Sequence, residues 1–369
     1  MRKTFYLMGC CLLFMLAACT NSSSIPYESV PNDPMKARIY TLDNGLKVYL
    51  TVNKEKPRVQ TYIAVRVGGK NDPKETTGLA HYFEHLMFKG TNHFGTADYE
   101  KEEPLLNQIE DLFEEYRQMT DEASRKALYH QIDSISYEAS KYAIPNEYDK
   151  LMSAIGANGT NAYTSFDETV YVEDIPSNEM EIWAKIQSDR FQNAVIRGFH
   201  TELETVYEEK NMSLTKDGRK MLEAILSSLY PDYPYGTQTV LGTQDHLKNP
   251  SIKKIKEYYN TWYVPNNIAI CMSGDLDPDK TIAIIQKYFG SMPANPSLPA
   301  RPEPKENPLT APVVKEVIGL DAENVALAWR LPSDTKSDLL LTLVNEVMNN
   351  GKAGLMDVDL LQSQRILYG

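Results

Sequence analysis

The sequence predicts an α+β fold in which a mostly antiparallel sheet is covered on one face by helices. Residues 38–50 alternate apolar and polar side chains on either side of Asn44-Gly45, a dipeptide typical of β-hairpin turns. Residues 61–67 and 268–272 are further strand-like stretches, and helical patterns lie between and after them. This combination favours an α+β domain over residues 37–290.

One predicted helix carries two histidines and a carboxylate on a single face. In the stretch His81-Tyr-Phe-Glu84-His85, residues three and four apart would lie side by side on the helix. We expect Thr77 to cap the start of this helix. Apolar side chains that would bury it are Leu79, Ala80, Phe83 and Leu86 to Phe88. The two imidazoles and the carboxylate are therefore predicted to point into one pocket from a buried, rigid element.

These side chains are of the types that bind zinc and activate water. Neutral imidazoles suit zinc, and a catalytic site usually combines three protein ligands with a water whose pKa the metal lowers. His81 and His85 leave such a site one ligand short. The alternative interpretation is a pair of hydrogen-bonded core histidines, although the chain has only six histidines in all.

The order of the motif, with the acid before the second histidine, is the signature of the inverzincins. Its context, residues 68–73 followed by residues 77–91, resembles the pitrilysin/insulysin (insulinase) family of zinc metallopeptidases almost position by position. Further matches lie at Asn161 to Tyr171, Tyr235-Gly236, Gly242-Thr243, Tyr263 to Asn267 and Gly274-Asp275. They extend over roughly residues 38 to 290, so the resemblance is far more specific than the five-residue motif.

The resemblance implies that the third zinc ligand is a glutamate on a later helix. The family's pattern, similar to Glu-x-x-x-Val-x-x-Glu, aligns here with Glu202 to Glu209 through Val206. Glu209 would then be the ligand and Glu202, two turns earlier on nearly the same face, a supporting catalytic carboxylate. Glu204 and Glu208 are competitors, but a shift of one residue turns a helical side chain by about 100°. The alternative is that this acidic run is a solvated helix face.

Together these assignments imply a zinc endopeptidase that hydrolyses peptides or unfolded polypeptide segments with one metal ion. Zinc on His81, His85 and Glu209 would polarise a bound water, and Glu84 would take its proton as the water attacks a peptide carbonyl. Two other classes remain open from the sequence. One is a non-catalytic partner subunit, as inactive members of the family are, and the other is a lipid-anchored peptide-binding module with a structural zinc.

The resemblance also assigns Asn161, Ala162, Tyr163 and Thr164 to a substrate-binding edge strand. In the family the equivalent segment lies beside the zinc, and the substrate adds to it as a further strand through main-chain hydrogen bonds. Residues 170–172 are expected to form the neighbouring strand. The alternative is an ordinary sheet edge protected by its own chain.

An inserted helical hairpin is predicted over residues 100–145. The chain between His85 and Glu209 is several dozen residues longer than in compact members of the family. Within it, apolar residues repeat at helical spacing in two runs, with a turn and cap at residues 119–123 between them. A further helix is expected to start after Asn146, which would cap it.

The N-terminus predicts export and membrane anchoring. Residues 1–18, a basic start followed by a short apolar run, are interpreted as a signal peptide. The run ends in Leu16-Ala-Ala-Cys19, which resembles the bacterial lipobox, so Cys19 is the candidate lipidation site and residues 19–36 its tether. This implies the bacterial cell envelope, and Thr20 in place of an aspartate favours the outer membrane facing the periplasm. The alternative is a plain secretory cleavage site.

Composition sets further limits on partners and stability. The formal charge is −12 at pH 7, which argues against nucleic acid and anionic lipid surfaces as partners. Apolar residues make up 42% of the chain, which is ample for a core at this length. Cys271 is the only cysteine after Cys19, so no disulfide within the mature chain is expected.

The C-terminal part is predicted to begin a second unit. A helix is expected from Pro278 to Phe289, capped by Asp277 and ended by Gly290. Residues 291–312 contain seven prolines and are interpreted as a linker. Residues 313–369 resemble the start of the family's second, non-catalytic half-domain, of the same α+β type and incomplete. About fifty residues cannot bury such a core alone, so a further half-domain segment or a partner subunit would complete the chamber.

Overall fold

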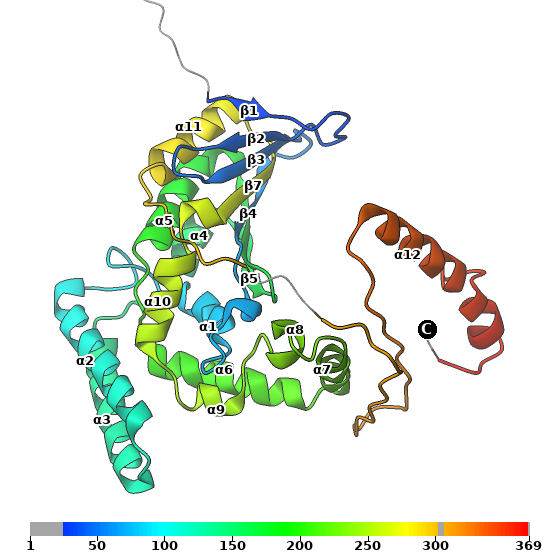
Figure 1. Ribbon diagram of the computed structural model, residues 1–369. Coiled ribbons are helices and arrows are strands. Elements are labelled where there is room, and N and C mark those ends of the chain that lie inside the picture. Colours follow the sequence, from blue (N-terminus) through cyan, green and yellow to red (C-terminus); the bar gives the residue numbers. More distant parts are fainter. Residues whose placement is uncertain (1–24, 302–305, 368–369) are drawn as a thin grey trace, which may run out of the picture.

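A seven-stranded sheet organises the computed structural model, which describes residues 25–301 and 306–367 (Figure 1). The strand order is β1-β2-β3-β7-β4-β6-β5, and all neighbouring strands are antiparallel except β3 and β7. The strands are β1 (Tyr27–Glu28), β2 (Arg38–Thr41), β3 (Lys47–Val52), β4 (Arg58–Val65), β5 (Asn158–Thr164), β6 (Thr169–Pro176) and β7 (Ile268–Gly274). The expected α+β class with a mostly antiparallel sheet is confirmed.

Helices cover one face of the sheet. Along β4, Val59, Thr61, Ile63 and Val65 are fully buried, whereas Tyr62 on the opposite face is 40% exposed. In Figure 1, α4, α5, α10 and α11 lie on the same side of the sheet. The helices are α1 (Leu79–Leu86), α2 (Tyr99–Gln118), α3 (Glu122–Ser140), α4 (Glu147–Ala154), α5 (Met180–Gln192), α6 (Phe199–Leu214), α7 (Asp217–Leu229), α8 (Pro234–Thr237), α9 (Gln244–Leu247), α10 (Ile252–Trp262), α11 (Pro278–Phe289) and α12 (Thr335–Met348).

The predicted β-hairpin is present between β2 and β3. Gly45 has a φ of 87°, a conformation that favours glycine. The Asn44 side chain accepts a hydrogen bond from Leu46 N and donates one to Phe289 O, which joins the hairpin to the end of α11. The Asp277 carboxylate caps the first turn of α11, as the sequence predicts.

The predicted helical insertion forms a pair of packed helices, α2 and α3. Asp98 and Asp121 cap the two helices through their carboxylates. A buried ion pair fastens the insertion to the domain, because Arg197 donates to both carboxylate oxygens of Glu102 at 2.5 and 2.8 Å. The insertion is therefore docked on the domain by a specific contact as well as by its apolar face.

Two of the predicted helix caps are wrong. Gly78, not Thr77, occupies the N-cap position of α1, and the Thr77 amide and hydroxyl instead meet Nδ1 of His246 at 3.1 and 2.7 Å. Asn146 precedes α4 in the left-handed region with a φ of 56°, and its side chain makes no capping hydrogen bond. Both residues therefore lie in the turn that leads into the helix, and neither side chain caps the helix.

The first turn of α1 is capped by Asp72, which lies well upstream of the helix. Its carboxylate oxygens accept from Gly78 N at 2.7 Å and from Ala80 N at 3.0 Å, and the residue is buried. Burial raises the pKa of Asp72 to about 8, although the backbone donors act in the opposite direction.

Asp72 should make the folded state less stable as the pH rises. A carboxyl group whose pKa is higher in the folded protein binds its proton preferentially there. Its contribution to stability is therefore complete below the unfolded pKa of about 4 and is lost as the pH passes about 8. We expect the urea midpoint of metal-free wild-type protein to fall over this interval, and that of Asp72→Asn to fall less. Equal pH slopes for the two proteins would contradict this titration.

The predicted N-terminal features lie mostly outside the described residues. The signal peptide at 1–18 and the candidate lipidation site Cys19 belong to residues 1–24, for which the structure gives no description. Within the predicted tether, Tyr27 and Glu28 pair with β2, so this part of the tether is attached to the sheet. Across residues 25–301 and 306–367, no helix is both long enough and apolar enough to cross a bilayer.

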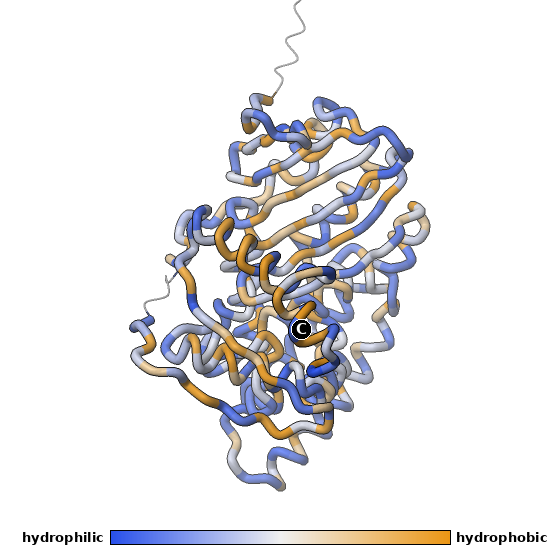
Figure 2. Tube along the Cα trace, turned by 90° about the vertical axis from the view of Figure 1, so that its right-hand side faces the viewer, coloured by the Kyte–Doolittle hydropathy of each residue, from blue (hydrophilic) through white to orange (hydrophobic). Residues whose placement is uncertain are grey.

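The chain after α11 is largely exposed. Residues 306–334 form neither helix nor strand, and Leu320 and Trp329 are 96% and 72% exposed. The helix α12 begins after Asp334, which caps it, and most of its leucine side chains are also exposed. This region faces the viewer in Figure 2, where α12 is largely orange.

Candidate metal centre

The helix α1 presents His81, Glu84 and His85 from a buried element, as the sequence predicts. Leu79, Ala80, Phe83 and Leu86 are all buried. The end of the helix is held by Arg190, whose Nε donates to Met87 O at 2.9 Å. Arg190 is itself fully buried and stacks on the rings of Phe88, Tyr148 and Tyr171. Asp72 at one end and Arg190 at the other therefore fix the helix.

The helix α6 brings two glutamates to α1. The Tyr82 hydroxyl donates to Phe199 O at 2.6 Å, and the two rings lie 5.0 Å apart, so the start of α6 is joined to α1. Val206 on α6 is fully buried. Glu202 and Glu209 are seven residues apart, close to two helical turns, and both reach the histidines of α1.

Three side chains converge closely enough to share a metal ion. Among the described residues, His81, His85 and Glu209 form the one such group of histidine, cysteine or acidic side chains. The two Nε2 atoms are 3.3 Å apart, and Glu209 Oε2 lies 3.4 Å from His81 Nε2 and 3.5 Å from His85 Nε2. A tetrahedral zinc with bonds of about 2.0–2.1 Å separates its ligands by about 3.3–3.4 Å. The donor set fits zinc in type, number and spacing.

Glu202 fixes the orientation of His85. Glu202 Oε1 and Nδ1 of His85 are 2.7 Å apart, and the other carboxylate oxygen of Glu202 pairs with Lys89. Burial acts to raise the pKa of Glu202, but the hydrogen bonds from His85 and Lys89 outweigh it and lower the pKa to about 2. An ionised Glu202 requires a proton on Nδ1, which leaves the lone pair of His85 Nε2 free for a metal.

The two imidazoles differ in their affinity for protons. Burial, with smaller contributions from His85 and Arg219, lowers the pKa of His81 to about 3. Burial also disfavours charge on His85, but Glu202 and Glu209 outweigh it and raise the pKa of His85. A metal must therefore compete with a proton mainly at His85.

Glu84 lies beside the converging donors and is held by a different residue. Its Oε2 accepts a hydrogen bond from the Thr164 hydroxyl at 2.5 Å, and Glu84 is only 8% exposed. Burial raises the pKa of Glu84, and the hydrogen bond from Thr164 opposes that rise. A buried carboxyl group next to a candidate metal site is chemically suited to proton transfer.

The two competing glutamates of α6 do not reach the centre. Glu204 is exposed and lies 3.9 Å from His200 Nε2, and Glu208 is exposed and accepts from Asn211. Their positions agree with the helical rotation expected for a one-residue shift from Glu209.

The segment assigned to substrate binding lies at the edge of the sheet. β5 is the last strand in the order, and it pairs with β6, the strand expected beside it. Asn161 and Tyr163 are exposed, whereas Ala162 and Thr164 are half-buried, and Thr164 reaches Glu84. The edge position is confirmed, and the role in substrate binding stays a prediction.

Four supporting residues did not stand out in the sequence: Asp72, Lys89, Arg190 and His246. Lys89 lies four residues after His85, and that spacing was the one available signal. The other three come from elsewhere in the chain and act on backbone atoms near the ends of α1. Contacts of this kind leave no periodic pattern in the sequence.

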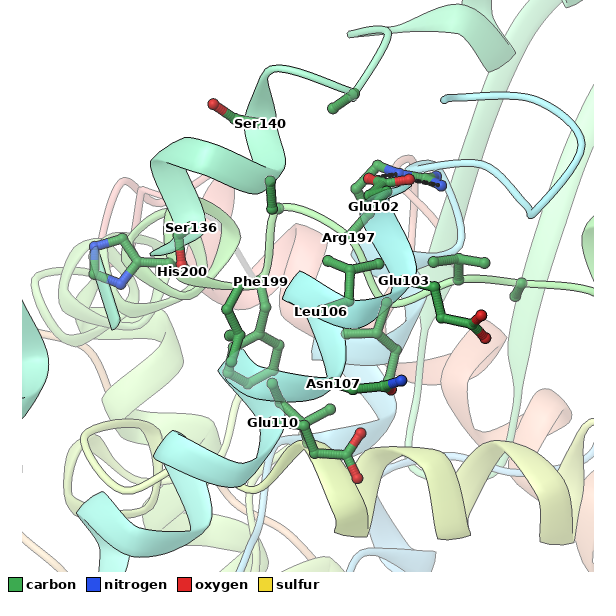
Figure 3. Close-up of a pocket in the computed structure, with 18 of the residues that line it drawn as sticks. Glu102, Glu103, Leu106, Asn107, Glu110, Ser136, Ser140, Arg197, Phe199 and His200 are labelled. Carbon is green, nitrogen blue, oxygen red and sulfur yellow. Dashed lines mark hydrogen bonds and ion pairs between the residues drawn. The ribbon is translucent and has the colours of Figure 1, made fainter. Parts of the chain in front are cut away.

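A cavity of about 160 Å³ lies apart from the metal centre, between the α2–α3 pair, the start of α6 and α10 (Figure 3). Its lining includes Leu106 and Phe199, and the Glu102–Arg197 ion pair forms part of its wall. None of the five residues predicted for metal binding or catalysis lines this cavity. The cavity is therefore separate from the candidate metal centre.

The fold and the candidate metal centre are of the inverzincin type. The domain is an α+β structure in which α1 carries the inverted histidine motif and α6 carries the glutamate. A family model described as insulinase (peptidase family M16) matches residues 47–109, and one described as the peptidase M16 inactive domain matches residues 251–366. These matches and the similar proteins below support a relation to the pitrilysin/insulinase family of zinc proteases.

Bacterial proteins named as zinc proteases or probable zinc proteases are among the similar proteins. The chain is 24% identical to zinc protease PqqE of Helicobacter pylori, over 88% of this chain and 64% of that protein. It is 23% identical to the probable zinc protease PqqL of Escherichia coli, over 88% of this chain and 30% of that protein. The chain thus spans less than two thirds of the length of either relative.

Solved structures share the fold. A protease from Helicobacter pylori matches with a TM-score of 0.55 and 22% identity, over 73% of this chain and 53% of that chain. The first half of the periplasmic protease PqqL from Escherichia coli matches with a TM-score of 0.56 and 20% identity, over 76% of this chain and 51% of that one. Both matches agree with the α+β architecture described above.

Proposed function

We propose that the chain is a zinc-dependent endopeptidase that hydrolyses peptides or unfolded polypeptide segments. The observation that carries the proposal is the convergence of His81, His85 and Glu209 at 3.3–3.5 Å, with Glu84 on the same helix as the two histidines. Relatives named as zinc proteases support the same metal and the same class of reaction.

His81, His85 and Glu209 would hold one zinc ion, which when bound is a Lewis acid that acidifies water and polarises a carbonyl group. Glu84 accepts a proton from the attacking water and returns it to the leaving amine nitrogen. Without metal, burial raises the pKa of Glu84, and a zinc dication beside it would favour the ionised form that a base requires. Glu202 contributes by keeping the proton on Nδ1 of His85.

The free edge of β5 would bind the substrate. An extended peptide can pair with the main chain of Asn161, Ala162, Tyr163 and Thr164, which gives affinity that depends little on sequence. Thr164 places this edge directly beside Glu84. A substrate must be extended to pair in this way, which favours peptides and unfolded segments over folded proteins.

We also propose a location in the bacterial cell envelope. The structural relative from Escherichia coli is described as a periplasmic protease. Lipidation of Cys19 would anchor this chain, with the outer membrane facing the periplasm as the favoured site. Because the relatives are longer, a second half-domain or a partner subunit would complete the chamber around the substrate.

Metal removal tests the proposed function. The zinc-loaded wild-type chain is expected to hydrolyse an internally quenched, unstructured peptide, to lose this activity with a chelator and to regain it with zinc. Magnesium should not restore it, since that ion prefers oxygen ligands and two of the three donors here are imidazoles. Zinc binding without turnover, also when the second half-domain or partner subunit is supplied, would contradict the proposal and favour a non-catalytic partner subunit or a binding module with a structural zinc.

A further inference from the structure

We propose that Thr164 is a positioning residue for Glu84, and that it sets the general base relative to the strand that holds the substrate. This inference rests on the proposed function and deepens it. The sequence assigned Thr164 only to main-chain binding of substrate, as one of four residues on an edge strand. Its side chain provides a second and separate contact.

The hydroxyl group of Thr164 has one proton, and the geometry directs it to Glu84. Thr164 Oγ lies 2.5 Å from Glu84 Oε2 and 3.5 Å from Thr169 Oγ, so the short contact takes the proton. Thr169 is fully buried and donates its own proton to Val67 O at 3.0 Å. The hydroxyl of Thr164 is therefore free to hold Glu84, and it leaves Glu84 Oε1 for proton transfer.

The main chain at Thr164 is fixed by the turn that follows it. Gly69 N donates to Ser165 O at 3.0 Å, and Lys70 N donates to Phe166 O at 3.1 Å. A side chain at Gly68 would collide with the Ser165 carbonyl, so the glycine permits this close approach. The turn after β5 is thus clamped to the segment just before α1, and the Thr164 hydroxyl has a defined position.

Thr164 belongs to the face of β5 that meets α1. Exposure alternates along the strand, with Asn161 and Tyr163 exposed and Ala162 and Thr164 half-buried. The same residue therefore lies on the strand proposed to bind the substrate and offers its side chain to Glu84. A substrate carbonyl bound to β5 and the Glu84 carboxylate would both be positioned by Thr164. Their fixed relative position favours proton transfer.

Three variants of the full chain separate positioning from packing. Thr164→Val keeps the shape and removes the hydroxyl, Thr164→Ser keeps the hydroxyl, and Thr160→Val makes the same change at another half-buried threonine of β5. We expect Thr164→Val to lower kcat about tenfold or more, with KM and zinc content close to wild type. Thr164→Ser and Thr160→Val should stay within about threefold of wild type. An unchanged kcat in Thr164→Val, or a loss confined to KM, would overturn the proposal.

Crystal structures of wild type and Thr164→Val keep this inference distinct from the proposed function. The proposal requires the Glu84 carboxylate to lose its single orientation in Thr164→Val while α1 and β5 stay in place. If the wild-type chain proves inactive, the endopeptidase function fails. The two structures still show whether the Thr164 hydroxyl orients the Glu84 carboxylate. A Glu84 carboxylate that keeps the same orientation without the hydroxyl would refute the positioning role.

Discussion

Replacing Glu84 by glutamine is expected to abolish peptide hydrolysis and to leave zinc binding intact. The amide has nearly the same shape, and its oxygen can still accept from Thr164, but it cannot take a proton from water. General acid–base catalysis typically contributes 10²–10⁴-fold, so kcat should fall by at least about 100-fold. Zinc affinity should change little, because Glu84 is not one of the three converging donors. Steady-state kinetics and metal analysis on the same sample measure both quantities.

A matched control for this variant is Glu204→Gln. Glu204 carries the same chemical group on the exposed side of α6, so its replacement should leave both kcat and zinc content near wild type. Normal turnover in Glu84→Gln would exclude the base role. A loss of zinc in parallel with activity would instead make Glu84 a ligand, and the assignment of the three donors would need revision.

Local patterns in the sequence predicted much of the fold. Apolar spacing located α1 and the paired helices α2 and α3, and Asn44-Gly45 located the hairpin between β2 and β3. Each of these signals lies within one short stretch of chain, where helical or strand periodicity is decisive. The parallel pairing of β3 with β7 was not predicted, since it joins segments more than 200 residues apart, about which local periodicity carries no information.

The wrong caps show where local rules stop. Thr77 has the right chemistry to cap α1, but the buried carboxylate of Asp72 takes the amide of Gly78, and His246 takes the Thr77 hydroxyl. The local preference is overridden because the carboxylate of Asp72, six residues before Gly78, already satisfies the first donors of the helix, while the distant His246 engages the Thr77 hydroxyl. Propensity alone cannot rank such competitors.

The candidate site was predictable in its chemistry and less so in its geometry. The spacing of His81 and His85 on a helix fixes their relation to each other. Their relation to Glu209 depends on how α6 packs on α1, and only a family resemblance suggested that packing. The Tyr82–Phe199 contact is one of those that join the two helices. The contact of Thr164 with Glu84 joins residues 80 positions apart and had no signal in the sequence.

Replacing Glu209 by glutamine should weaken zinc binding by more than about 100-fold. The variant loses the only anionic donor of the set, and changes at outer-shell partners already cost about 10- to 100-fold. Glu208→Gln is the matched control, because it removes the same charge at the neighbouring position. The Glu208 side chain is exposed and contacts Asn211 rather than the histidines. Competition with a chromophoric chelator at fixed pH measures both affinities, and the control should stay within about threefold of wild type.

The two glutamate variants should differ in how they respond to added metal. If Glu209 binds zinc, activity lost in Glu209→Gln should return in part at high zinc concentration, because mass action refills a weakened site that still has Glu84. Glu84→Gln should gain nothing from the same treatment, since its site is already filled. Because the pKa of His85 is raised, zinc affinity in wild type should also fall as the pH falls, through proton competition at that ring. If Glu209→Gln bound zinc as tightly as wild type does, Glu209 would not be the third ligand, and the structural basis for a catalytic metal site would be lost.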